Sequence, residues 1–422
     1  MVIALIIANY LLLPRTSAFS LSNIFPALAL ILCVLDVGAQ DTTVARRGSQ
    51  REQVDLIDIG RHLFLKHPGV RNDSAAKKVG KVYGSLLPSA EYTLQTAFAV
   101  NLTGNAAFYT GERAEDNISN IYLNLTYTQK HQFVIPLDVN IWTRGNRYNI
   151  LSDWRYEKFP QDTYGLGGLT QADSGYLIDF SYIRFYQTIL KTVAPDFYLG
   201  LGYDLDYFWS VREVGLPPGK VTDFQRYGLH PTSTSSGVTF NLLYDSRRNA
   251  INPEPGNYLN VVYRPNFTFL GSDANWQTLL IDGRKYIHLP GDGKNTLAFW
   301  TFDWLTLHGD PPYLLLPSTA SDTYVNMGRG YIQGRFRSKN VLYLESEYRF
   351  GIMANGLLGG VVFANAQSYT EPSSGRFESI SPGWGAGIRI KLNKFSHTNI
   401  ALDYGFGLHG SKGIFANLGE VF

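Results

Sequence analysis

Three charged side chains on one predicted strand carry most of the chemistry that this sequence offers. Apolar and polar residues alternate from Leu342 to Phe350, so Glu345, Glu347 and Arg349 share one face of the strand. Two carboxylates and a guanidinium on one face can form charge-assisted hydrogen bonds, or they can simply line a water-filled channel. A long irregular stretch, residues 308–339, precedes this strand.

Motifs of common enzymes are missing. The eight histidines are scattered, with no His-x-x-x-His and no Gly-x-Ser-x-Gly. A lipase built into a barrel could still bring Ser and His together from distant strands. The single cysteine, Cys33, lies in an N-terminal apolar stretch, which leaves no other cysteine for a disulfide or a metal site. We therefore predict no enzyme activity, no metal site and no cofactor.

The composition favours a membrane barrel. Aromatic residues make up 14% of the chain and charged residues only 17%, against about 25% charged in an ordinary soluble protein. Mean hydropathy is −0.11, and no stretch after residue 40 is apolar enough for a transmembrane helix. These features together are typical of an outer-membrane β-barrel, and a soluble all-β protein is the alternative. A net charge of +2 without a basic run predicts no nucleic-acid partner.

From residue 82 onward the sequence consists of strands and turns. Apolar and polar residues alternate over about ten residues at a time, the period that a barrel wall between lipid and water requires. The pattern predicts an all-β fold, a 16-stranded antiparallel transmembrane β-barrel over residues 82–422. The predicted strands are 82–87, 91–109, 119–130, 132–143, 148–158, 176–191, 197–211, 234–245, 258–269, 275–289, 296–307, 340–350, 357–368, 383–392, 399–407 and 414–422.

Loop lengths give this count an independent check. If the first strand runs outward, the connections after odd strands are extracellular and those after even strands are periplasmic. The four longest connections all follow odd strands, and most periplasmic ones are short, as in bacterial barrels. These four are 159–175, 212–233, 308–339 and 369–382.

The N-terminal region predicts a signal peptide and a short segment of its own. An apolar run from Ile24 to Leu35, followed by Val37-Gly38-Ala39, is typical of a secretory signal over residues 1–39, and we expect the true start codon to lie further downstream. Residues 40–81 are long enough for one amphipathic helix or a plug. A solvated periplasmic tail is the alternative for this segment.

The last predicted strand ends on an aromatic residue. Residues 414–422 form an amphipathic strand that includes Gly419 and closes on Phe422. Such an ending resembles the sorting signal that outer-membrane barrels present to their assembly machinery. Together with the loop parity, it supports an outer-membrane location.

Four patches in residues 234–422 resemble the BamA/TamA superfamily of outer-membrane assembly barrels, the bacterial surface antigen family. The family's Asp-x-Arg turn and Pro-x-x-Gly hairpin match Asp245, Arg247, Pro253 and Gly256. Its Arg-Gly-Phe/Tyr motif at the tip of the sixth extracellular loop matches Arg329-Gly330-Tyr331, which follows predicted strand eleven, as the family requires. Its Glu-x-Arg strand matches residues 345–350, and its Phe-x-Asp-x-Gly strand aligns with residues 360–366.

The resemblance implies that the sixth loop folds back into the barrel and that Arg329 docks on Glu345 and Glu347. Gly330 would permit a tight backbone and Tyr331 would supply a stacking or hydrogen-bonding ring. This chain departs from the family at Asn365, where an Asp is expected. Asn365 can still accept a hydrogen bond from Arg329, so we expect the substitution Asn365→Asp to be tolerated.

A second departure concerns function. Family members that act as insertases or secretion pores carry POTRA domains of about 75 residues before the barrel, and residues 40–81 are too short for one. The resemblance implies a POTRA-less barrel that assists insertion or translocation of outer-membrane proteins or lipid through a weak seam between strands 82–87 and 414–422. A passive pore or a structural partner barrel is the alternative. Expected partners are outer-membrane lipid and, in the first case, other envelope proteins or nascent barrels, with the oligomeric state open.

Overall fold

The structure, a computed structural model, describes residues 53–65, 82–93, 96–111, 117–247, 252–253, 255–290, 295–394 and 397–422. The predicted signal peptide, its cleavage site and the segments 40–52 and 66–81 lie outside the described residues. No described helix is both long and apolar enough to cross a membrane.

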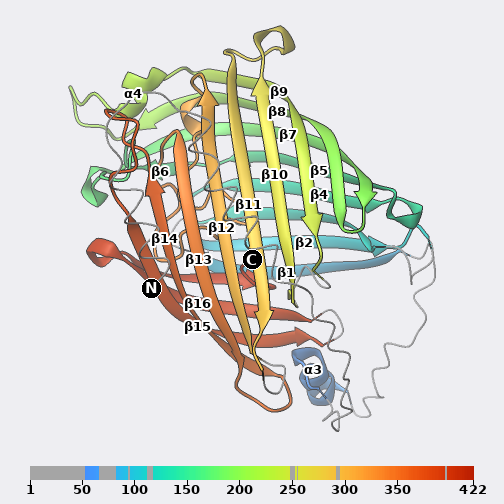
Figure 1. The fold of residues 1–422 in the computed structure, drawn as a ribbon. Coiled ribbons are helices and arrows are strands. Elements are labelled where there is room, and N and C mark those ends of the chain that lie inside the picture. Colours follow the sequence, from blue (N-terminus) through green and yellow to red (C-terminus); the bar gives the residue numbers. More distant parts are fainter. Residues whose placement is uncertain are drawn as a thin grey trace. The chain divides into compact units, whose positions relative to one another are not determined.

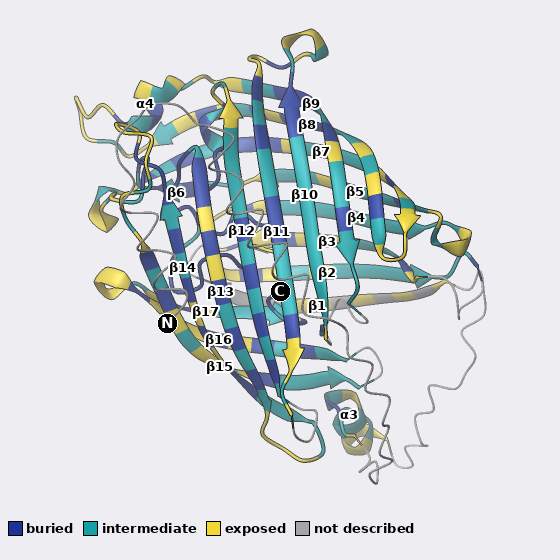
Figure 2. Ribbon diagram, viewed as in Figure 1, coloured by how far each residue is buried: buried dark blue, intermediate teal, exposed yellow. Residues whose placement is uncertain are grey.

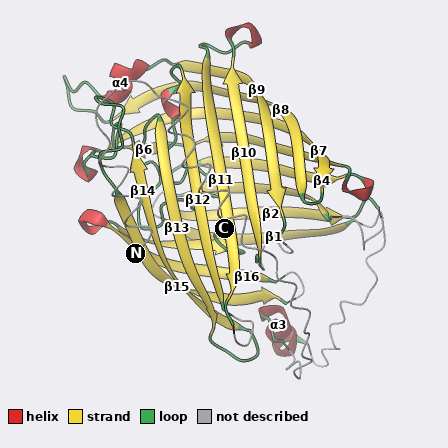
Figure 3. Ribbon diagram, viewed as in Figure 1, coloured by secondary structure: helices red, strands yellow, loops and turns green. Residues whose placement is uncertain are grey.

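The described chain forms one antiparallel sheet that curls round on itself (Figures 1 and 3). Each long strand pairs with the next one along the chain, so the sheet is a simple meander. The strands are β1 (Tyr83–Thr93), β2 (Ala97–Phe108), β3 (Ser119–Thr128), β4 (Phe133–Trp142), β5 (Tyr148–Lys158), β6 (Gln161–Thr163), β7 (Tyr176–Ala194), β8 (Phe197–Val214), β9 (Thr232–Asp245), β10 (Gly256–Asn266), β11 (Trp276–His288), β12 (Thr296–His308), β13 (Asn340–Gly351), β14 (Leu358–Tyr369), β15 (Ser381–Asn393), β16 (Thr398–Gly407) and β17 (Lys412–Leu418).

The predicted all-β antiparallel architecture is confirmed, with one short strand more than expected. The sheet has 17 strands, and β6 accounts for the difference because it has only 3 residues. It lies beyond the end of β5 and pairs with the same strand, β7. The extra strand forms because β7 has 19 residues and β5 only 11, so part of β7 extends past its neighbour.

The sheet departs from the predicted closed barrel at its two ends. In the described part of the chain, no ladder of hydrogen bonds joins β1 to β17, although the two strands lie near each other. A strand that is paired on one side only tolerates proline. This explains why Pro88 lies inside β1 and pairs in register with Leu102, whereas the sequence placed a break between two strands there.

The last strand is also shorter than predicted. β17 ends at Leu418 instead of residue 422, and the chain changes direction at Gly419, whose φ is +105°. Only glycine adopts such a φ readily, so the turn occurs where the sequence permits it. Residues 420–422 therefore leave the wall.

Buried and exposed residues alternate along the strands, as the sequence pattern predicted (Figure 2). On β13, Leu342 and Leu344 are 37% and 49% exposed, while Tyr343 and Glu345 are 0% and 3% exposed. The apolar residues face outward and the charged residues face the interior of the barrel, which we call the lumen. An apolar exterior with a polar interior is the pattern of a barrel in lipid.

Helices are few and lie at the ends of the sheet. α3 (Leu56–Phe64) falls within the N-terminal segment, and α4 (Asp223–Gly228) lies in the connection between β8 and β9. Val54 N donates to Asn355 O over 3.2 Å and Lys394 Nζ contacts Asp58 Oδ2 at 2.8 Å, so α3 is bound to two of the short turns. Short 3-10 turns occupy Arg144–Asn146, Ala172–Ser174, Thr268–Leu270, Tyr313–Leu315 and Leu408–Gly410.

Candidate functional site

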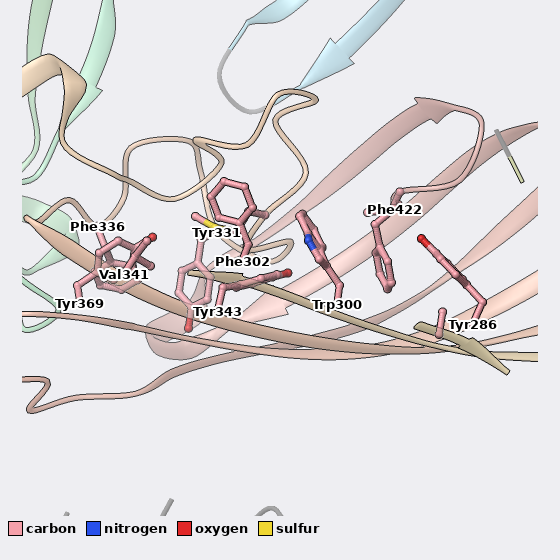
Figure 4. Packing of buried hydrophobic residues seen from close by; sticks show 12 residues of the cluster. Tyr286, Trp300, Phe302, Tyr331, Phe336, Val341, Tyr343, Tyr369 and Phe422 are labelled. Carbon is pink, nitrogen blue, oxygen red and sulfur yellow. The ribbon is translucent and has the colours of Figure 1, made fainter. Parts of the chain in front are cut away.

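The candidate site is built around the connection between β12 and β13, residues 309–339, which we call the docking loop. The loop pairs with itself: Thr319 N donates to Phe336 O over 2.9 Å, and Ala320 N donates to Met327 O over 3.0 Å. Met327, Tyr331 and Phe336 belong to an apolar cluster with residues of β11, β12, β13 and β14 (Figure 4). The loop therefore packs on the lumenal face of the wall.

A carboxylate organises the tip of the docking loop. Asp322 Oδ1 accepts hydrogen bonds from the backbone N–H groups of Asn326 and Met327, at 2.8 and 2.7 Å. Burial raises the pKa of Asp322 even though these N–H groups favour its charged form. The turn also holds Val325 at a φ of +60°, which is unusual for a β-branched residue.

Arg329 is the centre of the site. Its guanidinium donates to Glu345 and Glu347 on β13 and to Asp403 on β16. The side chain is 0% exposed, and its guanidinium carbon lies 3.7 Å from the centre of the Phe363 ring. A planar cation between carboxylates and an aromatic face fixes both the position and the orientation of the loop. The pairing with Glu345 and Glu347 is the one that the sequence predicted.

Asp403 is the partner that the sequence did not indicate. Its strand was predicted correctly, but nothing in the spacing along one chain shows that β16 faces the docking loop across the curved wall. Position 403 lies on the lumenal face of β16, and such alternation is the only signal that could have marked it. Asp403 thus supplies a carboxylate to Arg329. In the family pattern, the corresponding carboxylate would stand at position 365.

Asn365 has a different role from the predicted one. Its Nδ2 donates to the backbone carbonyl of Arg329 over 2.9 Å, whereas the sequence allowed Asn365 to accept a bond from Arg329. Its Oδ1 is buried with no hydrogen-bond partner among the described residues. The bond differs from the expected one because the loop presents its backbone, not its cation, to β14 at this point.

Gly330 and Tyr331 pack against Gly405 and Gly407 of β16, where no side chain occupies the space. Gly330 has a φ of +109°, and Tyr331 OH donates to Pro382 O over 2.7 Å and accepts from Leu408 N over 2.9 Å. A Cβ at Gly405 would lie 2.7 Å from the Gly330 nitrogen, and one at Gly407 would lie 2.6 Å from the Tyr331 ring. Glycine on the lumenal face of β16 therefore lets the loop approach the wall.

A network of charges extends from Arg329 along the wall. Arg349 Nε donates to Glu347 over 2.7 Å, and Arg389 bridges Asp403 and Glu420 at 2.5 and 2.7 Å. The ion pairs join three guanidinium groups to four carboxylates, and all of these side chains are at most 8% exposed. The sequence predicted Arg349 as a lumenal partner, but it did not predict Arg389 or Glu420.

The predicted turn motif forms a local structure between β9 and β10. Arg247 makes two hydrogen bonds of 2.8 Å to the Asp245 carboxylate, and its guanidinium carbon lies 4.2 Å from the Tyr258 ring centre. Pro253 is buried, and a Cβ at Gly256 would lie 2.9 Å from Ser246 O. These contacts shape the hairpin and do not involve Arg329.

The other wall of the lumen carries a second charge network that the sequence did not single out. Arg264 on β10 donates to Asp206 on β8 over 2.6 Å, and Arg184 on β7 donates to Asp153 on β5 over 3.2 Å. The first pair links β10 and β8, the two strands on either side of β9, and the second links the paired strands β7 and β5. Among the described residues, no group of three or more His, Cys, Asp or Glu side chains is arranged to hold a metal ion.

Several long connections meet at the end of the sheet that is predicted to be extracellular. Arg337 of the docking loop donates to the carbonyls of Tyr313 and Leu316 over 3.1 and 3.2 Å, and its own carbonyl accepts from Gly167 N over 2.8 Å. Glu371 accepts from Gly168 N over 2.7 Å. The docking loop is therefore bound to the connection around residue 167, which in turn is bound to Glu371.

Comparison with known proteins finds similar folds among solved structures and no match by sequence. No family model matches the chain, and no curated protein matches it by sequence. Among solved structures, BamA from Haemophilus ducreyi lacking POTRA domains 1-3 superposes with a TM-score of 0.54 at 14% identity, covering 80% of this chain and 70% of that one.

Two CdiB structures are also similar. CdiB from Acinetobacter baumannii has a TM-score of 0.52 at 10% identity, covering 80% of this chain and 60% of that one. CdiB from Escherichia coli has a TM-score of 0.50 at 9% identity, covering 80% and 63%. This chain thus spans less than two thirds of either CdiB chain. At these identities the likeness concerns the fold, which is that of the BamA and CdiB barrels.

Proposed function

We propose that this chain is an outer-membrane barrel of the BamA/TamA kind that assists the insertion or translocation of polypeptides or lipid through a seam between β1 and β17. The observation that carries the proposal is the missing ladder between these two strands in the described part of the chain, in a sheet whose other neighbours are all paired. The docked Arg329 motif and the BamA-like fold support it.

The physical basis for lateral opening is the low cost of separating this seam. β1 has 11 residues and β17 has 7, and each of them has a full ladder with only one neighbour. Unpaired backbone groups on both edges can bind an incoming strand by adding it to the sheet. Opening anywhere else in the sheet would break an existing ladder of hydrogen bonds.

The location and chemistry follow from the same features. An apolar belt with exposed Leu201, Phe240 and Ile414 fits outer-membrane lipid, the first partner we propose. Nascent barrels and other envelope proteins are the proposed polypeptide partners. We further propose that the chain acts by binding and not as an enzyme, with no cofactor.

A disulfide lock across the seam tests the proposal. The double variant Leu86→Cys with Ile414→Cys places one cysteine on β1 and one on β17, at outward-facing positions that are 70% and 51% exposed. The readout is insertion of a small barrel protein into lipid vesicles that contain the full chain. We expect oxidation of this variant to abolish the gain in insertion and reduction to restore it.

A matched lock within an existing ladder is the control. Leu402→Cys with Ala416→Cys joins residues that are already opposite each other in β16 and β17, so oxidation should leave insertion unchanged. If the seam lock forms and insertion persists, the lateral-opening proposal is wrong. Ion conductance in planar bilayers with no insertion activity would instead support the passive pore, and neither activity would support a structural partner barrel.

A further inference from the structure

Residues 419–422 enter the lumen instead of extending the wall. Gly419 N still donates to Asn399 O over 2.8 Å, the last backbone–backbone bond from this edge to β16 among the described residues. Val421 and Phe422 are each 3% exposed and belong to the same apolar cluster as the docking loop. Figure 4 shows the Phe422 ring beside Trp300 and Tyr286 on the lumenal side of the wall.

An aromatic and cationic surface holds the Phe422 ring. Its centre lies 5.1 Å from that of Trp300 with an interplanar angle of 28°, and 6.2 Å from that of Tyr286. The guanidinium carbon of Arg349 lies 5.1 Å from the Phe422 ring centre. Stacking and cation–π contacts of this kind recognise an aromatic ring and would not hold a small polar side chain.

The backbone of this segment is bound by side chains and not by a strand. Asn326 Nδ2 donates to Val421 O over 2.8 Å, and Arg349 Nη2 donates to Phe422 O over 3.0 Å. The Glu420 carboxylate accepts from Arg389 Nε over 2.7 Å and from Asn399 Nδ2 over 2.6 Å. The protein thus contacts two carbonyls, one carboxylate and one ring, as a receptor contacts a bound peptide.

We propose that Trp300, Tyr286, Arg349 and Asn326 form a binding site for an extended peptide segment with an aromatic residue, and that residues 419–422 are its internal, displaceable occupant. We call these four residues the Trp300 site. The β16–β17 ladder ends at Leu418, and in the described chain only side chains of the wall and the docking loop bind residues 420–422, so the occupant can leave without breaking that ladder. A tethered segment of this length competes with a free peptide at an effective concentration on the order of mM.

Displacement would also change the seam, and this second step rests on the proposed function. Release of residues 419–422 would allow β17 to grow from 7 residues to 11, the length of β1. Asn326 donates to Val421 O and accepts a 2.9 Å bond from Asn417 on β17. On release of residues 419–422, the docking loop would therefore lose its bond to Val421 and keep its bond to β17. A strand that supplied its own aromatic residue would in this way exchange places with residues 419–422.

Direct peptide binding tests the site without any insertion assay. The probe is a fluorescent Gly-Glu-Val-Phe peptide amide, measured by anisotropy with the full chain folded in detergent and with a variant that stops at Leu418. We expect the shortened variant to bind at least tenfold more tightly than the full chain, because its site is empty. A peptide with Ser in place of Phe should not bind to either protein, and protein-free micelles correct for partitioning.

Substitutions distinguish the site from general unfolding. Trp300→Ala in the shortened variant should abolish binding, whereas Trp154→Ala, which removes an outward-facing Trp stacked on Phe185, should not. If the shortened variant does not fold, Phe422→Ser in the full chain provides the emptied site instead. Equal binding by the full chain and the emptied variants, or equal binding of the Ser peptide, would overturn the proposal. Peptide binding without insertion activity would leave the Trp300 site standing and would count against the proposed function alone.

Discussion

Two walls of the lumen carry buried charge, and only one of them pairs its charge with a charged side chain of the docking loop. On the wall from β13 to β16, Glu345, Glu347 and Asp403 all contact a cation that the docking loop delivers. On the wall from β5 to β10, the pairs Arg184–Asp153 and Arg264–Asp206 join strands to one another. The docking loop reaches this second wall through a 3.5 Å bond from Arg155 to Thr323 O.

The difference shows what buried charge does in each place. Ion pairs between strands of the same wall satisfy polar groups of the wall itself, and they gain little net stability because both ions lose their hydration. An excess of carboxylate on one wall creates a site that only an added cation completes. In this barrel the cation is Arg329, so the charge on the first wall sets the position of the loop.

The largest expected effect comes from removing the two central cations in turn. Arg329→Ala and Arg264→Ala should each cost about 3–5 kcal/mol, because each leaves buried carboxylates without a partner. Urea unfolding in detergent measures this cost. Only Arg329→Ala should expose residues 309–339 to limited proteolysis in the folded barrel. Equal protease sensitivity of both variants would mean that Arg329 stabilises the barrel without positioning the loop.

Removing one carboxylate from each wall should give a smaller effect. Asp403→Asn leaves Arg329 with Glu345 and Glu347 and leaves Arg389 with Glu420, so it should cost about 1.5–3 kcal/mol, the value of a hydrogen bond to a charged group. Asp204→Asn on the other wall should cost less, because Asp204 lies 3.7 Å from Arg264 and Asp206 remains at 2.6 Å. The same urea measurement applies. A cost for Asp204→Asn as large as for Asp403→Asn would remove the proposed distinction between the walls.

The close approach of Gly330 to Gly405 can be tested without changing any charge. Gly405→Ala places a Cβ 2.7 Å from the backbone nitrogen of Gly330, so it should cost about 1–3 kcal/mol through overpacking. When samples are heated to a series of temperatures before electrophoresis, the band of the folded barrel should disappear at a lower temperature for this variant. Gly104→Ala on β2 is the matched control, since its nearest atom is 3.8 Å away. Equal behaviour of the two variants would show that the loop does not require glycine at position 405.

The sequence predicted the features that depend on local periodicity. Alternation placed Glu345, Glu347 and Arg349 on one face, and loop parity placed residues 308–339 after the correct strand. It could not show that Asp403 contacts Arg329. Asp403 lies on β16, which is separated by β14 and β15 from β13, the strand that carries Glu345 and Glu347. The sequence also missed the inward turn at Gly419, since a glycine in an alternating run does not reveal its own φ. Asn365 contacts Arg329 as expected, but it donates to the backbone carbonyl. The sequence could not show this, because the path of a loop backbone leaves no pattern in the sequence.

The smallest expected effect concerns Asn365, where the first wall binds the loop backbone. Asn365→Asp removes the donor to the Arg329 carbonyl and places a carboxylate oxygen against it, so the structure reverses the expectation of tolerance. The loss should be about 0.5–1.5 kcal/mol, the usual net value of one hydrogen bond. Asn365→Ala, which removes the donor and the unpaired Oδ1 together, is the control and should cost no more than Asn365→Asp. If Asn365→Asp instead raises the free energy of unfolding, attraction between the new charge and the guanidinium outweighs the backbone contact, and the wall recognises the loop by charge alone.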